Sequence, residues 1–446
     1  MTPMNSAIAA TTLRNERKGL SAGQWLLILM TGIFFVASPL SMGTSGFANQ
    51  AKYIRVALTL VMASYMLVIG LSRARRCTFW LLSFAVFYGA GALWSDSPVW
   101  GVLNKGLFVL TTASGLALAM AMRRQADLNK IMSILLIFLE LTTLALLISV
   151  VLNPDAALVI GRLSVHGMNA NTIGQTALPA VVLAAWVSMN STTRAQRYRG
   201  IITSTALSLI LLSTGSRGAA AAALAGILIV MAPHLKRPLR VAAGVTVAAV
   251  AYIVVSELVG LQISERYYED LFKNTRSGIW NYAMRQFESS PAIGVGWVHH
   301  GNSSGNLHSV YLQVAVESGV VGLVLLGLVL CVVAATSQKI YSKLKKTHLE
   351  LSALTLSLGL VASVLVHGVG EAGAILGSTV NCFMLAFGIG LLDRLSAPHF
   401  TQARRQQRGR LTGIGRVVNP PGVDISSTAA RQSVCRLNLL PTSATW

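Results

Sequence analysis

Long apolar runs alternate with short polar packets along almost the whole chain. A helix needs about twenty apolar residues to cross the hydrocarbon of a bilayer. The pattern therefore predicts an all-α integral membrane protein with about twelve transmembrane helices and one large external loop, which carries a short amphipathic helix. The predicted spans are 23–41, 54–71, 79–94, 103–122, 131–152, 171–189, 200–214, 218–232, 239–258, 311–337, 351–371 and 374–393.

Composition agrees with this pattern and narrows the classes of partner. Hydrophobic residues make up 53% of the chain, charged residues only 11%, and the mean hydropathy is +0.61. Soluble domains carry roughly 25% charged residues. The net charge of +21 is spread in small packets between apolar runs, whereas nucleic-acid binders gather their basic residues on one face or domain. Membrane lipids are thus the expected surroundings, and no nucleic-acid partner is expected.

The basic residues also predict the topology. The stretch 200–232 is either one long helix or a hairpin broken at Thr214–Gly218. With the hairpin, 27 of the 36 Lys and Arg residues fall on one side of the membrane. Positive residues stay on the cytoplasmic side, so the hairpin is favoured and both termini are predicted to be cytoplasmic. The basic start of the chain, which could pass for a secretory signal, is interpreted as leading into a retained first helix.

This topology divides the chain into five parts: a cytoplasmic N-terminal segment (1–22), helices 1–9 (23–258), a periplasmic loop (259–310), helices 10–12 (311–393) and a basic, disordered cytoplasmic tail (394–446). Within the loop, apolar residues recur at helical spacing from Ile279 to Phe287. That spacing predicts an amphipathic helix that lies along the membrane surface with its apolar face down.

Arg217 is the most informative external residue, because it lies at the tight break between two apolar helices. A charge so close to hydrocarbon depth faces a water-filled cavity or a partner. A guanidinium grips phosphate through two parallel hydrogen bonds, so Arg217 is a candidate anion clamp. The alternative is an interfacial arginine whose head reaches out to water.

Other candidates lie in or near the external loop. Arg276 precedes the amphipathic helix and adds charge to its positive N-terminal end; it could equally be a solvated loop residue. His308 opens the next helix and could shuttle a proton, although a lone histidine is more often structural. No metal site is expected at His299-His300 or among the four scattered cysteines. Glu371 lies near the outer boundary, and Glu140, mid-span, is either a paired structural group or part of a proton path.

Five short segments, taken in order, carry a resemblance to a known family. They resemble motifs of the bacterial O-antigen ligase and polysaccharide polymerase family, lipid-linked glycan transferases of the inner membrane. The resemblance covers about 80–390, with its specific part at 160–320. Ser309 and Ala170 depart from it, standing where Asn and Pro are usual. The segments are 93–98, 162–171, 214–218 (Ser-Arg-Gly), 276–296 (Arg, Trp and Pro-x-x-Gly-x-Gly) and 308–322 (His-x-x-x-Leu and Glu-x-Gly).

The resemblance implies an activity and roles for these residues. The donor would be a glycan on undecaprenyl pyrophosphate, transferred on the periplasmic side, without metal or other cofactor, to a glycan or a lipid core. Arg217 and Arg276 would stabilise the leaving pyrophosphate, and His308 would act as general base or orient the attacking hydroxyl. The substrate-binding residues would be Arg162, Asn171 and Trp280.

Two alternatives stay open. A ligase passes the finished glycan to a terminal acceptor, whereas a polymerase joins repeat units, and the motifs do not separate them. A transporter or flippase of lipid-linked or small anionic substrates also suits twelve spans. Against it, the chain shows no convincing internal repeat, and its strongest candidate charges lie at the outer face. Nothing in the sequence indicates an oligomeric state.

Overall fold

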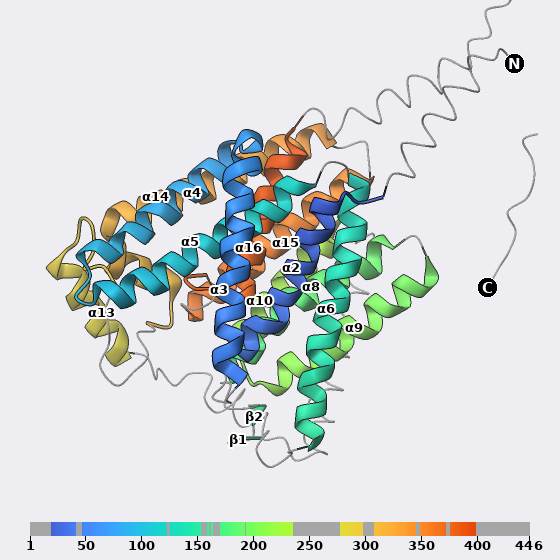
Figure 1. Cartoon of the computed structure of the whole chain (residues 1–446), viewed down its shortest axis with the longest axis horizontal. Coiled ribbons are helices and arrows are strands. Elements are labelled where there is room, and N and C mark those ends of the chain that lie inside the picture. The colour runs from blue at the N-terminus through green and yellow to red at the C-terminus, as the bar shows by residue number, and fades with distance from the viewer. Residues whose placement is uncertain are drawn as a thin grey trace, which may run out of the picture. The chain divides into compact units, whose positions relative to one another are not determined.

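The computed structural model describes residues 19–41, 47–122, 125–152, 158–159, 162–163, 170–191, 193–234, 277–297, 307–344, 348–371 and 375–397. These residues form twelve α-helices and one two-stranded hairpin (Figure 1). The helices are α2 (Ala22–Leu40), α3 (Phe47–Tyr65), α4 (Arg76–Ala90), α5 (Pro98–Ala121), α6 (Gln125–Leu152), α8 (Ala170–Asn190), α9 (Arg194–Ser213), α10 (Arg217–Met231), α13 (Ser277–Ser289), α14 (Val310–Leu344), α15 (His348–Gly370) and α16 (Val380–Leu395).

The remaining elements are short. A π turn (Met66–Gly70) and a 3-10 turn (Leu71–Arg73) extend α3, a 3-10 turn (Gly91–Trp94) extends α4, and another (Ala232–His234) follows α10. The strands β1 (Leu158–Val159) and β2 (Arg162–Leu163) pair antiparallel. Among the described residues this confirms the all-α, polytopic membrane class.

Eight of the described helices are long and apolar enough to span a membrane. They account for eight of the twelve predicted spans. Three more predicted spans correspond to α9, α10 and α16, which are helical but either short or polar at one end. The predicted span 239–258, most of the loop, Arg276 and nearly all of the tail lie outside the described residues. The last span starts at Val380 rather than at 374, because 375–379 forms a turn that Thr379 ends by capping α16.

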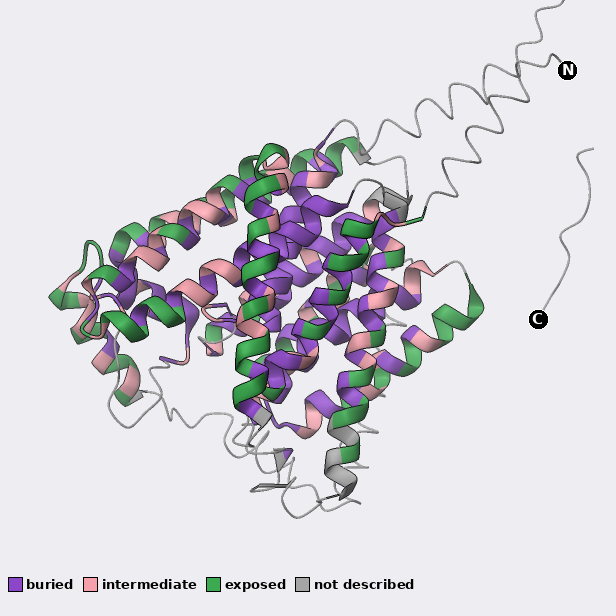
Figure 2. Cartoon of the chain, in the orientation of Figure 1, coloured by how far each residue is buried: buried purple, intermediate pink, exposed green. Residues whose placement is uncertain are grey.

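Burial separates inner from outer helices. In α8, 89% of the most apolar 18-residue window is buried, against 28% in the window of α14 and in that of α3 with its extension. Figure 2 shows the same contrast, with α8 and α16 mostly buried and α3 and α9 exposed along one side. Large apolar side chains are exposed on α3, as in Leu60 and Val61, and on the π turn that extends it, as in Leu67 and Val68. Lipid-facing surface of this kind is what a spanning helix requires.

The predicted break between α9 and α10 is confirmed, and the chain reverses there. Gly200 of α9 packs against Ser188, near the end of α8. Gly174, near the start of α8, instead faces Thr214 and Ser216, at the break. Since Gly226 of α10 packs deeper along α8, on Val182, α9 runs antiparallel to α8 and α10 runs parallel to it. The turn residue Gly215 has φ +61°, a conformation that glycine adopts without steric cost.

Glu140, which the sequence left open, pairs with an arginine. Its carboxylate receives two hydrogen bonds from Arg199 Nε, at 2.8 and 2.9 Å, and one from Thr203 Oγ1 at 2.7 Å. Arg199 lies near the start of α9, at the opposite end of that helix from Thr214. The pair therefore fastens α9 to α6, which favours a structural role over a proton path.

At the end of the bundle that holds the basic packets, Asp393 of α16 caps a different helix. Its side chain is 2% exposed. Asp393 Oδ2 accepts hydrogen bonds from the backbone N–H groups of Arg75 at 3.2 Å and Thr78 at 2.8 Å, and Oδ1 accepts one from Cys77 at 3.1 Å. Arg75, the residue before α4, makes no side-chain cap of its own. The carboxylate thus satisfies donors that a helix start otherwise leaves without partners.

We expect Asp393→Ala to lower the free energy of unfolding by about 1–3 kcal/mol, because two buried N–H groups and one partly buried N–H group lose their acceptor. Thermal unfolding of the detergent-solubilised protein measures the change. Asp96→Ala is the matched control, since that carboxylate is exposed, and it should leave the midpoint in place. An unchanged midpoint for Asp393→Ala would remove the assigned capping role.

Candidate functional site

The ends of several helices meet at the opposite end of the bundle. Gly218 of α10 faces His367 near the end of α15, and Gly368 faces Val310 at the start of α14. Asn381, at the start of α16, contacts the same histidine, with 3.4 Å between Asn381 Nδ2 and His367 Nδ1. This arrangement gathers the starts of α10, α14 and α16 around the end of α15. Of the predicted site residues, Arg217, Asn171 and His308 lie on the segments that meet here.

His308 occupies the turn that leads into α14. Its φ is +54°, which makes it the one non-glycine residue with positive φ among those the structure describes. Ser309 follows, and its Oγ accepts a hydrogen bond from Leu312 N at 3.5 Å, so it caps the helix. Serine and asparagine are both favoured at this position, which explains how Ser309 fits where the resembled family has Asn. Ala170 is likewise the first residue of α8, a position that suits Pro but does not require it.

Glu371 joins two of the predicted site residues. Its Oε2 lies 3.5 Å from His308 Nδ1 and accepts a hydrogen bond from Asn171 Nδ2 at 3.4 Å. The side chain of Glu371 is 10% exposed and that of His308 is 31% exposed. The imidazole is therefore reachable from outside while its carboxylate partner is largely covered. The sequence placed Glu371 at the outer boundary without assigning it to the site, because its contacts come from two distant helices.

Arg217 is the first residue of α10. Ser216 precedes it as N-cap residue, and the backbone of Gly218 lies against His367, one turn before Glu371. Arg217 therefore stands at the positive end of the α10 dipole. His367 is near the end of α15, and Glu371 directly follows that helix. The start of α10 therefore lies near His308, Asn171 and Glu371, which we call the His308 cluster. Helix starts of this kind attract anionic groups.

The helix α14 is broken within its outer third. Gly319 has φ +63° and ψ −162°, which are not helical values. Past the break, Val320 N donates to the carbonyl of Pro291 at 2.8 Å, and Val321 N donates to that of Ala292 at 3.1 Å. The turn after α13 thus replaces the hydrogen bonds that the helix loses. An added Cβ at Gly319 would collide with the backbone of Ala292.

The same turn carries the Pro-x-x-Gly-x-Gly pattern. Gly294 has φ +75°, and a Cβ there would collide with the backbone of Ser318 in α14. Val295 N donates to Val316 O at 2.9 Å, so the turn pairs with both sides of the break. The two glycine motifs of the sequence therefore pack against each other. We call the contact between residues 291–295 and 316–321 the joint in α14, and Glu317 lies within it.

The amphipathic helix α13 exists, but its predicted position on the membrane surface is not what its contacts indicate. Ala283 is fully buried against Leu307 and Val316, and Ile279 and Phe287 pack beside it. The apolar face of α13 thus packs against the outer turns of α14 (Figure 1). Trp280, a predicted substrate-binding residue, is 40% exposed and lies at the edge of this apolar face. Its ring is therefore partly accessible, while the buried residues steady the segment before His308.

Two predicted site residues cannot be placed in full. Arg276 lies outside the described residues. For Arg162 the backbone is described, paired with Val159 in the short hairpin, and its side chain is not. Both stay predictions.

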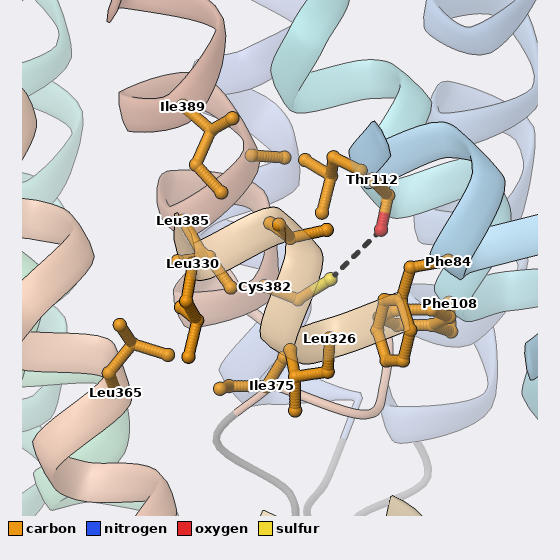
Figure 3. A pocket seen from close by; sticks show the side chains of 13 residues that line it. Phe84, Phe108, Thr112, Leu326, Leu330, Leu365, Ile375, Cys382, Leu385 and Ile389 are labelled. Atoms are coloured by element: carbon orange, nitrogen blue, oxygen red, sulfur yellow. Dashed lines mark hydrogen bonds between the residues drawn. The ribbon is translucent and has the colours of Figure 1, made fainter. Parts of the chain in front are cut away.

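An apolar cavity lies deeper between α4, α5, α14, α15 and α16 (Figure 3). Its two lining side chains with polar atoms, Thr112 and Cys382, are 3.6 Å apart and interact with each other. The remaining lining residues, such as Phe84, Leu326 and Ile389, are hydrocarbon. This cavity is small and apolar, and it offers no polar group to bind a sugar or phosphate beyond Thr112 and Cys382, which interact with each other.

Together, the apolar helices and the polar cluster at one end of the bundle define a multi-pass α-helical membrane protein. Residues 201–327 match the family model described as O-Antigen ligase. This segment, less than a third of the chain, is therefore similar to the O-antigen ligase family. The matched segment contains Arg217, Trp280 and His308 and overlaps most of the specific part of the resemblance noted in the sequence. A comparison with curated proteins gives no significant match.

Proposed function

We propose that this protein transfers a glycan from undecaprenyl pyrophosphate to a sugar hydroxyl at the periplasmic face of the bacterial inner membrane. The observation that carries the proposal is the meeting of His308, Asn171 and Glu371 at one end of the bundle, next to the start of α10 with Arg217. The family match over 201–327 supports the class of reaction.

The sidedness follows from charge. Arg73, Arg75 and Arg394 lie at the end of the bundle opposite His308, and Arg73 and Arg394 donate hydrogen bonds to Met120 O and Met122 O at the end of α5. Basic residues mark the cytoplasmic side. The His308 cluster then faces the periplasm, where a lipid-linked donor is presented, and both termini are cytoplasmic.

His308 is the proposed general base. A proton on Nδ1, held toward Glu371, leaves Nε2 with the lone pair that accepts a proton. The acceptor hydroxyl oxygen attacks the anomeric carbon of the donor, its proton passes to His308 Nε2, and the bond from that carbon to the pyrophosphate oxygen breaks. The pyrophosphate leaves with the electron pair. Asn171 steadies Glu371 from the side of α8.

Arginines are the proposed stabilisers of the leaving group. Negative charge builds on the pyrophosphate as the bond breaks, and fixed positive groups aimed at that charge often make the largest contribution to catalysis. Arg217 supplies a guanidinium at the positive end of α10, and Arg276 is assigned the same role. Arg162 and Trp280 are proposed to contact the phosphate or the glycan. With arginines neutralising the leaving group, the reaction requires no metal.

A reconstituted assay tests the proposal. Purified protein in liposomes, given a lipid-linked oligosaccharide and an acceptor, should release undecaprenyl pyrophosphate and form a new glycosidic bond. Extension of one lipid-linked unit by another would identify a polymerase, and transfer to a lipid core a ligase. A transporter would move the intact donor across the bilayer, and that result without bond formation would overturn the proposal.

A further inference from the structure

A charged cluster is buried beside the joint in α14. It consists of Tyr88 from α4, Lys105 from α5, and Gln313 and Glu317 from α14, and we call it the Glu317 cluster. Lys105 Nζ lies 3.2 Å from Glu317 Oε2, and both side chains are 1% exposed. Tyr88 OH donates to the same oxygen at 2.5 Å, and Lys105 Nζ lies 4.2 Å from the centre of the Tyr88 ring.

Packing does not explain this cluster. A buried ion pair costs desolvation that its attraction hardly recovers, and apolar residues of similar size are often as stable or more stable. Ionisable groups within membrane helices are rare and usually functional. The neighbouring backbone is also fitted to Lys105, because an added Cβ at Gly91 would lie 2.6 Å from Lys105 Nζ. The ion pair therefore requires a reason other than fold stability.

Gln313 connects the cluster to the turn that holds His308. Its Nε2 donates to Glu317 Oε1, and its Oε1 accepts a hydrogen bond from Leu307 N at 3.2 Å. Leu307 directly precedes His308. The Glu317 carboxylate can only accept hydrogen bonds, so it fixes the NH₂ group of the Gln313 amide toward itself. The amide oxygen of Gln313 then points toward the backbone N–H of Leu307.

His308 requires such support. Its left-handed backbone conformation is costly for a residue with a Cβ and persists where neighbouring contacts fix it. Gln313 fixes the residue before it, and the Ser309 cap fixes the residue after it. Without either contact, the turn would relax toward negative φ and carry the imidazole away from Glu371.

We propose that Tyr88, Lys105, Gln313 and Glu317 are positioning residues, which hold Leu307 and thereby keep His308 directed at Glu371 during transfer. The inference rests on the proposed function of His308. Lys105 and Glu317 do not contact the substrate; they act through the orientation of the Gln313 amide.

Two matched double variants separate positioning from charge. Lys105→Met with Glu317→Gln removes both charges and keeps an acceptor for Gln313 Nε2. Lys105→Met with Glu317→Leu also removes both charges, but it removes that acceptor. Neither leaves a buried unpaired charge, so each is expected to fold, and thermal unfolding of both checks this. Turnover and donor KM are measured in the liposome assay, and amide hydrogen exchange is followed in peptides that contain Leu307.

The two double variants are expected to differ in turnover and in amide exchange at Leu307. The Gln-containing double variant should recover most of the turnover lost in Glu317→Gln alone, which leaves Lys105 uncompensated. The Leu-containing double variant should lose turnover by about tenfold or more, as small displacements of a catalytic group do, with donor KM unchanged. Its Leu307 amide should exchange faster, because the Gln313 acceptor is no longer held in place.

Equal turnover in the two double variants would overturn the positioning role, and so would equal exchange at Leu307. A failure of the proposed function gives a different pattern. If His308→Ala keeps full transfer, His308 is not the base, whether or not the two double variants differ in exchange.

Discussion

Replacing His308 with alanine is expected to reduce glycan transfer by about 10²–10⁴-fold, the usual contribution of a positioned general base. A sugar hydroxyl is a weak nucleophile, and no other described imidazole combines partial exposure with a carboxylate at 3.5 Å. Cells that carry the variant should accumulate lipid-linked intermediates and lack long surface glycans. Single accumulated repeats would indicate a polymerase, and full-length chains left on the lipid a ligase. A gel ladder of surface polysaccharide, with analysis of extracted lipids, measures both.

Two companion variants sharpen this result. Glu371→Gln keeps the size of the partner but removes its charge, so we expect a partial loss of turnover with folding retained. His234→Ala is the matched control, because His234 ends the 3-10 turn at the far end of α10 from Arg217. It should transfer as the wild type does. Full activity in His308→Ala would remove the general-base assignment and bring the transporter alternative forward.

Arg217→Ala is expected to lower turnover by about 10²–10³-fold, the range seen when one stabilising donor is removed from a transition state. Arg217→Lys should restore only part of this activity, since an ammonium cannot form the planar, two-point contact that a guanidinium makes with phosphate. The loss should fall on turnover more than on donor KM, because charge on the pyrophosphate grows as the bond breaks. Initial rates at several donor concentrations in the liposome assay separate the two effects.

The control for this prediction is Arg197→Ala. Arg197 is an exposed arginine near the start of α9, at the opposite end of that helix from Arg217. The Arg197→Ala substitution removes one positive charge from the same α9–α10 hairpin and should leave transfer unchanged. Equal losses in the two variants would point to a general effect of charge or folding. Unchanged transfer in Arg217→Ala would contradict the assigned role.

The sequence predicted those features that depend on local patterns. Apolar run length located the described spans, and the Thr214–Gly218 break followed from a turn signal and the sidedness of charge. Asn171 and His308 were identified through motifs, and the structure brings them to one carboxylate. These features are readable because helix period and turn chemistry are encoded by near neighbours.

What the sequence did not predict depends on contacts between distant segments. Glu371 meets Asn171 across 200 positions, and Tyr88 meets Glu317 across 229. The apolar face of α13 was assigned to the membrane surface, but Leu307 and Val316 cover it. An amphipathic pattern predicts that one face of a helix is buried. It does not indicate whether that face packs against the membrane or against another helix. The same limit applied to Glu140, whose partner lies on another helix.

The break at Gly319 has a consequence for how the two parts of α14 can change over time. In a continuous helix, one inserted or deleted residue turns everything beyond it by about 100°. At Gly319 the helical phase is interrupted, and the turn after α13 bonds both sides of the break: Val295 bonds Val316 before it, and Pro291 and Ala292 bond Val320 and Val321 after it. Residues gained or lost in α14 beyond Val321 therefore need not rotate His308, because the turn holds the outer turns in place. Bilayer thickness and catalytic geometry are free to evolve separately.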